Sequence, residues 1–281
     1  MSTLASVHNA HRLAIFRQGL AEPLLVQHAP PDARPYVHPL AAPSGFGVLT
    51  EDTPPHHPWQ HGLYVGLNDV NGVGFWTEGL NSDTELDGTF HPAPLMMPTI
   101  DDDSATWQIR SEWRSPLGVP MLDEQQSWQL MDHGDTLVLD MVWKLQAHID
   151  ITFGRYAYGG LFLRMPYQAA TGGQLLSSEG CDRQTEAEAQ RARWIAVCMP
   201  IAGLADDAGI AMMDHPENPG HPNPWRVDSQ LGIAPSRCIT GPWQLANGQY
   251  STNRYRLFAF EGDIEVERIE SAWRDFTGQL R

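Results

Sequence analysis

The sequence predicts an all-β protein: a large two-sheet antiparallel β-sandwich with one C-terminal helix. Through most of the chain, hydrophobic side chains alternate with polar ones at the two-residue period of a strand. The 25 glycines and 22 prolines divide these stretches into short segments, as in a sandwich. With 281 residues, 42% hydrophobic and 19% charged, the chain can bury a large core. We expect residues 1–281 to form a single β-sandwich domain; the alternative is two small domains that separate within 167–190.

The clearest strands form a predicted β-hairpin over residues 124–146. Its second strand alternates through 137–145, and the preceding turn, at 132–135, reads Asp-His-Gly-Asp. Residues 106–115 alternate in the same way, so we expect them to pair beside the hairpin. Further short strands, each bounded by Gly, Pro, Asp or Asn, are predicted at 62–70, 73–79, 153–165, 191–202, 209–215 and 255–262.

The C-terminal segment has the pattern of an amphipathic helix. One face of residues 264–277 carries Val266, Ile269, Trp273 and Phe276. Asp263 stands where a side-chain cap is expected. We expect this helix to lie against the edge of the sandwich, and we expect residues 184–193 to form a short helix or a polar loop.

The charge of the chain limits its partners. Eighteen basic and thirty-four acidic residues give a net charge of −16, which repels nucleic-acid phosphates and anionic lipids. The longest apolar run, 194–205, is too short to cross a bilayer, and no signal peptide is visible at the start. We therefore expect neither nucleic acid nor a membrane as a partner. The three separated cysteines form no disulfide or zinc pattern, which indicates a cytoplasmic protein.

Two segments rich in histidine, proline and tryptophan interrupt the strand pattern. The first, residues 34–76, contains His38, His56, His57, His61, Asp69 and Asn71. The second, residues 214–227, contains four prolines together with His215, Asn218, His221 and Trp225. Because proline fixes φ, both segments should be stiff surface loops that present side chains in fixed directions. We expect them to converge, with Arg164, on one concave face.

Three kinds of chemistry fit these residues. A neutral imidazole is a natural acid or base near pH 7, which assigns catalysis to His57, His61, His215 and His221. Alternatively, His57 and His61, joined by His38 or His215, bind a divalent metal ion, although Pro58 opposes the helix on which their spacing would be diagnostic. Third, Trp59, Trp76 and Trp225 stack on a sugar ring while His, Asn and Asp side chains bond its hydroxyls. The binding residues are then His38, Asp69, Asn71, Arg164, Asn218 and Trp225. No cofactor other than the metal ion is indicated.

His61 needs a partner if it is to act as an acid or base. Asp69 stands at the far end of the strand predicted at 63–69, roughly 20 Å from the loop. We therefore expect the partner to come from a neighbouring element, with His215 or His221 as the best candidates. The motifs G-x-S-x-G, G-x-G-x-x-G and H-E-x-x-H and the Walker loop do not occur, so serine hydrolase, nucleotide and zincin chemistry have no motif support.

Seven segments of the chain follow the motif order of a known family. They are RPYVHPL, PSG, HPWQHGLYVGLNDVNGVGFW, GLFLRM, ARWIAV, DHPENPGHPNPWRV and YRLFAFEG. In this order they resemble the bacterial PmoA-like domain-of-unknown-function family, the so-called methane oxygenase PmoA family, over about residues 30 to 262. The sequence departs from the family pattern at Gln60 and His61, where the family often has His-Arg, and at Tyr64, where it often has Trp. His57 therefore matches the family motif better than Gln60 and His61 do.

The resemblance implies a galactose-mutarotase-like β-supersandwich and, from the sugar oxidoreductases and isomerases commonly encoded beside family members, a role in carbohydrate catabolism. A monooxygenase subunit is rejected, because that protein lies in a membrane and this chain has no spanning segment.

Together these observations predict a cytoplasmic carbohydrate-processing protein. It would act on a sugar, or on an oxidised (keto) sugar or glycoside, by histidine acid/base chemistry with or without a metal ion. Mutarotation, epimerisation and cleavage of a keto-glycoside are the reactions that fit. The alternatives are a non-catalytic sugar-binding or sensor protein and, third, a structural or partner-binding role. The expected partner is a small-molecule carbohydrate, and the sequence gives no indication of an oligomeric state.

Overall fold

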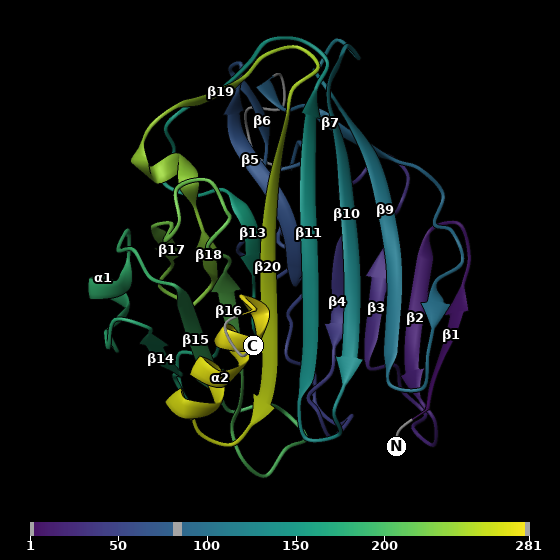
Figure 1. Ribbon diagram of the computed structural model, residues 1–281, viewed down its shortest axis with the longest axis vertical. Coiled ribbons are helices and arrows are strands. Elements are labelled where there is room, and N and C mark those ends of the chain that lie inside the picture. Colours follow the sequence, from purple (N-terminus) through teal and green to yellow (C-terminus); the bar gives the residue numbers. More distant parts are fainter. Residues whose placement is uncertain (1–2, 81–85, 279–281) are drawn as a thin grey trace.

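The computed structural model describes residues 3–80 and 86–278. Within them, two antiparallel sheets pack face to face, which confirms the predicted sandwich (Figure 1). The first, with eleven strands, follows the order β1 (Leu4–His8), β2 (Arg12–Arg17), β3 (Leu25–His28), β4 (Tyr36–Leu40), β5 (Leu63–Val70), β13 (Gly160–Leu163), β18 (Ile233–Pro235) and β17 (Trp225–Val227). Three more strands extend it beside β5: β6 (Val73–Phe75), β12 (Ile151–Phe153) and β19 (Trp243–Leu245).

The second sheet has nine strands, several of them long. Its order is β14 (Gln174–Ser177), β15 (Trp194–Met199), β16 (Ala208–Asp214), β20 (Tyr250–Glu261), β11 (Leu137–Ala147), β10 (Pro120–Asp132), β9 (Ser104–Arg114) and β7 (Thr89–Pro92), and β8 (Thr99–Ile100) pairs with β9. The predicted hairpin is confirmed as β10 and β11, and β9 pairs beside it as expected. The helical segments are α1 (Gln184–Ala187), a 3-10 helix (Arg237–Thr240) and α2 (Val266–Phe276).

Strand alternation creates two apolar layers around the eleven-stranded sheet. Side chains such as those of Leu63 and Val65 on β5 face the nine-stranded sheet and belong to the main core. Their neighbours in sequence point to the opposite, outer face. There Tyr64 packs with Trp76 and Phe162 in a separate aromatic cluster. This outer aromatic layer can form the apolar wall of a binding site whose other walls are loops.

The C-terminal helix is confirmed, but its position and its cap differ from the prediction. It begins at Val266 with Glu265 as the N-cap residue, which makes no side-chain capping bond, so Asp263 is not the cap. Ile269 and Trp273 pack on the outer face of the nine-stranded sheet, over β15, β16 and β20, and not at an edge. Val266 is 44% exposed, so the contact with the sheet is narrower than the apolar stripe predicted from the sequence. No helix of the described residues is both long and apolar enough to cross a bilayer.

Candidate functional site

A pocket of about 190 Å³ lies on the outer face of the eleven-stranded sheet. It is smaller than the roughly 300 Å³ at which sites for drug-sized molecules begin, so it admits a small ligand. Its polar lining comes from the 56–60 loop, from Arg164 directly after β13, and from β17 and the segment that follows it. Its apolar lining comes from the aromatic layer. The lining residues are His56, His57, Trp59, Gln60, Trp76, Tyr158, Phe162, Arg164, Arg226, Asp228, Ser229 and Gln230.

Arg164 is fixed in the wall of this pocket by three neighbours. Its side chain is 1% exposed, and its Nε donates to Gln60 Oε1 at 2.7 Å. Its terminal nitrogens donate to Asp228 Oδ2 at 2.5 Å and to Gln230 Oε1 at 3.2 Å. Because burial of a cation requires compensation, Asp228 is needed to hold the guanidinium here. The result is a pre-positioned donor group whose net charge is neutralised.

His57 is the least constrained polar group of the pocket. Its Nδ1 is buried and has no hydrogen-bond partner among the described residues. The ring meets Trp59 edge-on, with centroids 5.3 Å apart, and tight turns hold the backbone, since the amide of His57 donates to Pro54 O and its carbonyl accepts from Gln60. Burial, together with the nearby His56 and Arg164, lowers the pKa of His57 although Asp228 opposes this. The imidazole is therefore neutral at pH 7, the form that accepts a proton.

His61 belongs to a charge network next to the pocket. Its Nδ1 lies 2.8 Å from Asp52 Oδ1 and its Nε2 lies 2.9 Å from Glu78 Oε2. Glu78 in turn pairs with the buried Arg34 at 3.0 Å, whose guanidinium lies 4.5 Å from the centre of the Tyr64 ring. The expected partners of His61, His215 and His221, are therefore wrong. Both ring nitrogens serve carboxylates, so a metal ion at His61 would have to displace one of them.

The two charges of the network shift each other's pKa. Burial favours neutral His61, but the hydrogen bonds to Asp52 and Glu78 outweigh it and raise the pKa of the imidazole. Burial likewise favours protonated Glu78, but Arg34 and His61 outweigh it and lower the pKa of the carboxyl group to about 2. His61 therefore stays protonated to a higher pH than an ordinary imidazole, and its positive charge stabilises the paired carboxylates of the site.

The network predicts a window of pH in which it stabilises the protein. The contribution of Glu78 is present above pH 4.5 and is lost as the pH falls towards 2, whereas that of His61 is present below pH 6.5 and is lost as the pH rises further. Glu78→Gln should cost about 3 kcal/mol of unfolding free energy at pH 5–6.5 and progressively less below pH 4. Urea unfolding at a series of pH values measures this. The exposed Glu22→Gln is the matched control, and an equal cost of Glu78→Gln at pH 2.5 and pH 6 would contradict the network.

His38 lies beside this network and not in the pocket. Its Nδ1 is 2.9 Å from Thr50 Oγ1, and its carbonyl accepts from His28 Nε2 at 2.8 Å. Burial lowers the pKa of His38.

Gly62 follows the 56–61 loop and has a positive φ of +73°. A Cβ atom at this position would lie 2.6 Å from the carbonyl oxygen of Val37. A glycine is thus required at position 62 for the close approach of β5 to β4.

Asp69 and Asn71 hold the turn that follows β5. Asp69 Oδ1 accepts from the backbone of Gly72 at 3.1 Å. Asn71 donates to the carbonyl of Asp150 at 2.9 Å and accepts from the amide of Thr152 at 2.7 Å. Neither residue lines the pocket, and their polar atoms have structural partners.

The second histidine-rich loop is organised around Asp214 at the end of β16. Asp214 is 0% exposed and accepts from Asn218 Nδ2 at 2.7 Å, His221 Nδ1 at 3.0 Å and the amide of Asn223 at 2.8 Å. Asn218 Oδ1 accepts in addition from the amide of Arg254 at 2.6 Å. These bonds tie the loop to itself and to β20.

The remaining residues of this loop are distributed over different contacts. His215 Nδ1 accepts from the amide of Glu217 at 3.1 Å, and its ring meets Phe276 of α2. Trp225 is buried and donates from Nε1 to Ala192 O at 2.9 Å. His221 keeps its Nε2 free of hydrogen bonds to the described residues while Asp214 orients the ring. Of the residues singled out from the sequence, the pocket brings together His56, His57, Trp59, Trp76 and Arg164. The candidates of the second loop, His215, Asn218, His221 and Trp225, do not line it.

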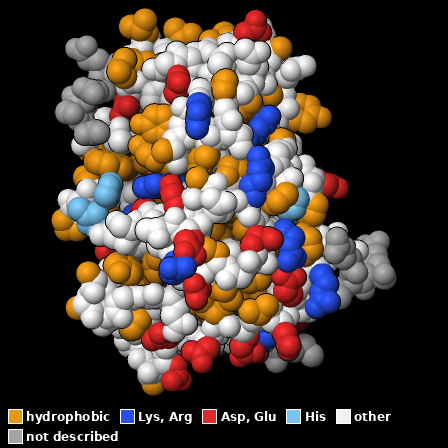
Figure 2. Space-filling model, turned by 90° about the vertical axis from the view of Figure 1, so that its left-hand side faces the viewer, with side chains coloured by type: hydrophobic (Ala, Val, Ile, Leu, Met, Phe, Trp, Pro, Cys, Tyr) orange, Lys and Arg blue, Asp and Glu red, His pale blue; other side chains and the backbone are white. Residues whose placement is uncertain are grey.

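Several residues of the site were missed from the sequence. Asp228 and Gln230, which fix Arg164, follow β17 without any local motif. Glu78, which bonds His61, gave no signal either, whereas Arg34 opens the motif RPYVHPL but was not assigned a role. Asp52 lies inside the histidine-rich segment, so proximity to His61 in sequence could have identified it. Figure 2 shows the side of the molecule that lies at the left of Figure 1, on which acidic side chains gather at the lower end and Lys and Arg side chains lie across the centre.

Three solved structures illustrate how distant the resemblance to known folds is. A galactose mutarotase related enzyme from Lactobacillus acidophilus has 9% identity and a TM-score of 0.40, covering 95% of this chain and 99% of that one. A candidate aldose 1-epimerase from Escherichia coli K12 has 13% identity and a TM-score of 0.39, covering 93% and 100%. A GH36 α-galactosidase from Geobacillus stearothermophilus has 9% identity and a TM-score of 0.39, covering 92% and 41%. Likeness this weak decides neither fold nor activity.

The match to a protein family is more extensive. No curated protein matches the sequence. The model of DUF6807, described as a family of unknown function, matches residues 22–274, which includes both histidine-rich loops and every residue that lines the pocket. This match does not carry the PmoA-like name that the motifs suggested. The chain belongs to the family of unknown function DUF6807.

Proposed function

We propose that the pocket binds a small carbohydrate and that the protein transforms it, with His57 as the general acid or base. The substrate class that fits is a sugar, or an oxidised (keto) sugar or glycoside. The observation that carries this proposal is the neutral imidazole of His57, whose buried Nδ1 is unpartnered among the described residues, beside the fixed guanidinium of Arg164. A ligand hydroxyl would satisfy that nitrogen.

The composition of the pocket supports a sugar over other small ligands. Trp59, Trp76, Tyr158 and Phe162 offer apolar faces to the carbon–hydrogen side of a ring, and Trp and Tyr retain polar edges. Gln60 and Gln230 add amides that donate to or accept from hydroxyl groups. Because Asp228 neutralises Arg164, the pocket favours a neutral polar ligand over a strongly charged one.

Arg164 supports catalysis on a carbonyl-containing sugar. A guanidinium held in place before the reaction stabilises negative charge that develops on an oxygen, at no further cost of reorganisation. His57 would move the proton at the neighbouring carbon or hydroxyl. Epimerisation beside a carbonyl and cleavage of a keto-glycoside both use this pair of roles, whereas mutarotation needs only proton transfer at the hydroxyl and ring oxygens.

Binding without turnover is the second candidate. His57 is the one acid/base group of the described pocket that is left without a side-chain bond, because His56 bonds Gln230 at 2.5 Å and Asp228 bonds Arg164. A sensor needs only the stacking and hydrogen-bonding groups.

The proposed location is the cytoplasm. Three free cysteines support it. Burial raises the pKa of Cys198 and of Cys238 to about 12, so both thiols stay unreactive.

A thermal-shift screen tests ligand binding. The panel holds neutral monosaccharides, keto-sugars and methyl glycosides, with uronic acids as the charged comparison. A sugar at 100 times its Kd should stabilise the native chain by about 2.7 kcal/mol. Trp59→Ala should abolish most of this shift, whereas the exposed His133→Ala should retain it. If no member of the panel stabilises the native chain, or if Trp59→Ala keeps the full shift, the pocket is not a sugar site.

A further inference from the structure

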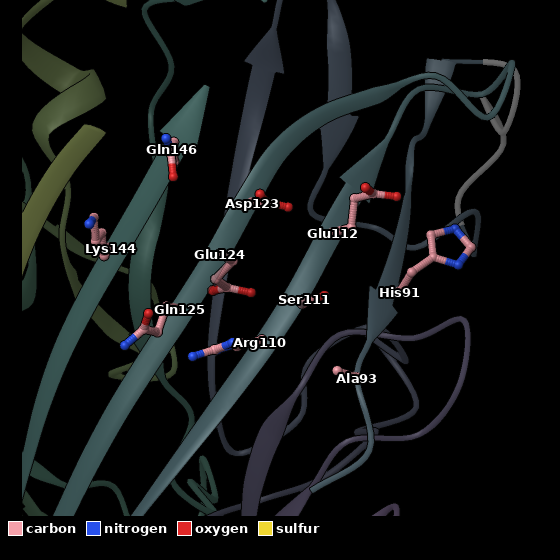
Figure 3. A pocket seen from close by; sticks show the side chains of 10 residues that line it. All are labelled: His91, Ala93, Arg110, Ser111, Glu112, Asp123, Glu124, Gln125, Lys144 and Gln146. Carbon is pink, nitrogen blue, oxygen red and sulfur yellow. The ribbon is translucent and has the colours of Figure 1, made fainter. Parts of the chain in front are cut away.

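A second pocket lies on the other sheet, on the outer face of the nine-stranded one. Its volume is about 390 Å³, and β7, β9, β10 and β11 all contribute to its lining (Figure 3). The charged side chains in this lining include Arg110, Glu112, Asp123 and Lys144. No residue is shared with the His57 pocket, so whatever this pocket binds is independent of the proposed sugar site.

Strand register separates the charges of this pocket into two rows. Asp123 pairs with Glu112 across β9 and β10. Two residues further along β10, Gln125 pairs with Arg110 on one side and Lys144 on the other. Figure 3 shows Glu112 and Asp123 near one end of the pocket and Arg110 and Gln125 further along the strands. An acidic row therefore lies about 7 Å from a basic row.

The basic row is not neutralised by the protein. Arg110 and Lys144 form no ion pair with any residue in the described part of the chain. Lys144, the only lysine of a chain with net charge −16, lies 4.1 Å from the centre of the Tyr250 ring. Two cationic side chains without an ion-pair partner in one pocket of so acidic a protein favour the binding of an anionic group.

The acidic row is completed by a histidine. His148 directly follows β11, and its amide donates to Met121 O at 2.9 Å, which holds it beside the start of β10. Its Nε2 lies 3.0 Å from Asp123 Oδ1. The ligand atoms of Glu112, Asp123 and His148 all lie within 4.8 Å of one another. Two oxygens and one nitrogen, from three different strands or strand ends, thus lie close enough together to share one ion.

We propose that Glu112, Asp123 and His148 bind a divalent transition-metal ion at the edge of this pocket. Oxygen and imidazole ligands suit Zn²⁺ and Mn²⁺, and three protein ligands leave coordination positions open. Glu112 and Asp123 line the pocket themselves, so the open positions face it. An anionic co-ligand would then meet Arg110 and Lys144. Metal binding replaces two surface ion pairs, Glu112 with Arg114 and Asp123 with His148.

Titration of the full chain with MnCl₂ and with ZnCl₂ tests this site without any substrate. Calorimetry, with Mn²⁺ electron paramagnetic resonance as a second readout, should show one saturable ion per chain. The double variant Asp123→Asn, His148→Gln should weaken this binding at least tenfold. All three ligands are at least partly exposed, so the variants should fold, and Glu112→Gln provides an independent replacement with the same expected direction.

A matched double variant separates the site from general attraction to an acidic surface. Asp135→Asn, His133→Gln changes the same residue types in the exposed turn between β10 and β11 and should leave the affinity within about twofold. No saturable binding to the native chain overturns the proposal, because the cluster is then a set of surface ion pairs. Equal binding by the native chain and the ligand variants also overturns it, because the ion then lies elsewhere. Neither outcome affects the sugar pocket.

Discussion

Replacing Asp214 with alanine is expected to lower the free energy of unfolding by about 3–5 kcal/mol. The carboxylate is fully buried and accepts hydrogen bonds from Asn218, His221 and Asn223. Alanine leaves these donors without their acceptor, at about 1–3 kcal/mol for each buried group, partly offset where water enters. Urea unfolding followed by tryptophan fluorescence measures the loss, and the exposed Asp206→Ala should change stability by less than about 0.5 kcal/mol.

The milder Asp214→Asn distinguishes charge from shape. Asparagine keeps the volume and one acceptor oxygen, but its amide nitrogen would face donors, so an intermediate loss of about 1–3 kcal/mol is expected. If Asp214→Ala costs less than about 1 kcal/mol, the 214–227 loop does not depend on this carboxylate. Its histidines would then be free for other roles, and His215 and His221 would return as equal candidates for catalysis.

The fold was predictable because the chain alternates where one face of a strand is buried. The hairpin of β10 and β11 shows this most clearly, since Leu139, Met141 and Trp143 are buried while Asp140 and Val142, which alternate with them, are more exposed. Alternation fails where polar residues face the core. Glu124 is buried between the sheets, where Trp113 and Trp143 donate to its carboxylate, and no sequence pattern separates it from its exposed neighbours. The position of α2 on the sheet face could not be predicted either. An apolar stripe shows that a helix packs against some other part of the protein, but it does not show against which part.

The site was predictable only in part, because residue type indicates chemistry and not position. His57 and Arg164 were placed in one site from rigidity, residue type and charge, and the structure puts them in the same pocket. The second loop uses the same residue types for another purpose, since Asp214 gathers its Asn and His side chains into a fold of its own. Hydrogen-bond partners that are distant in sequence decide between the two uses. Glu78 and Asp228 are such partners, and only the assembled sheet brings them to His61 and Arg164.

Of the candidate histidines, His57 and His221 each meet one geometric requirement for acid/base chemistry. His221 is oriented by Asp214 in the way that a carboxylate orients a catalytic imidazole, but it lines neither of the two pockets described above. His57 has no orienting carboxylate bond, but it lines the pocket with Arg164. Because a general acid or base must reach the proton it moves, location decides before orientation. The proposed function therefore depends on His57.

His57→Ala is accordingly expected to lower the turnover of the sugar that gives the largest thermal shift by about 100-fold or more. Affinity should change only a few-fold, because Trp59, Trp76 and Arg164 remain. Since the pKa of His57 is lowered below its ordinary 6.5, a native enzyme that uses the neutral imidazole should lose its rate on the acidic side at a lower pH than an ordinary imidazole would give. That acidic limb should vanish in the variant.

His221→Ala is the matched comparison for this prediction, because it removes an equivalent ring outside the pocket. It should leave kcat within about threefold once its folding has been verified by urea unfolding. Should His57→Ala bind the sugar and turn it over like the native chain while His221→Ala loses the rate, the acid/base role belongs to the second loop. Should native protein bind the sugar without any turnover, the pocket is a sensor site. In that case His57→Ala would act on affinity alone, since a hydrogen bond to Nδ1 is then all that the imidazole contributes.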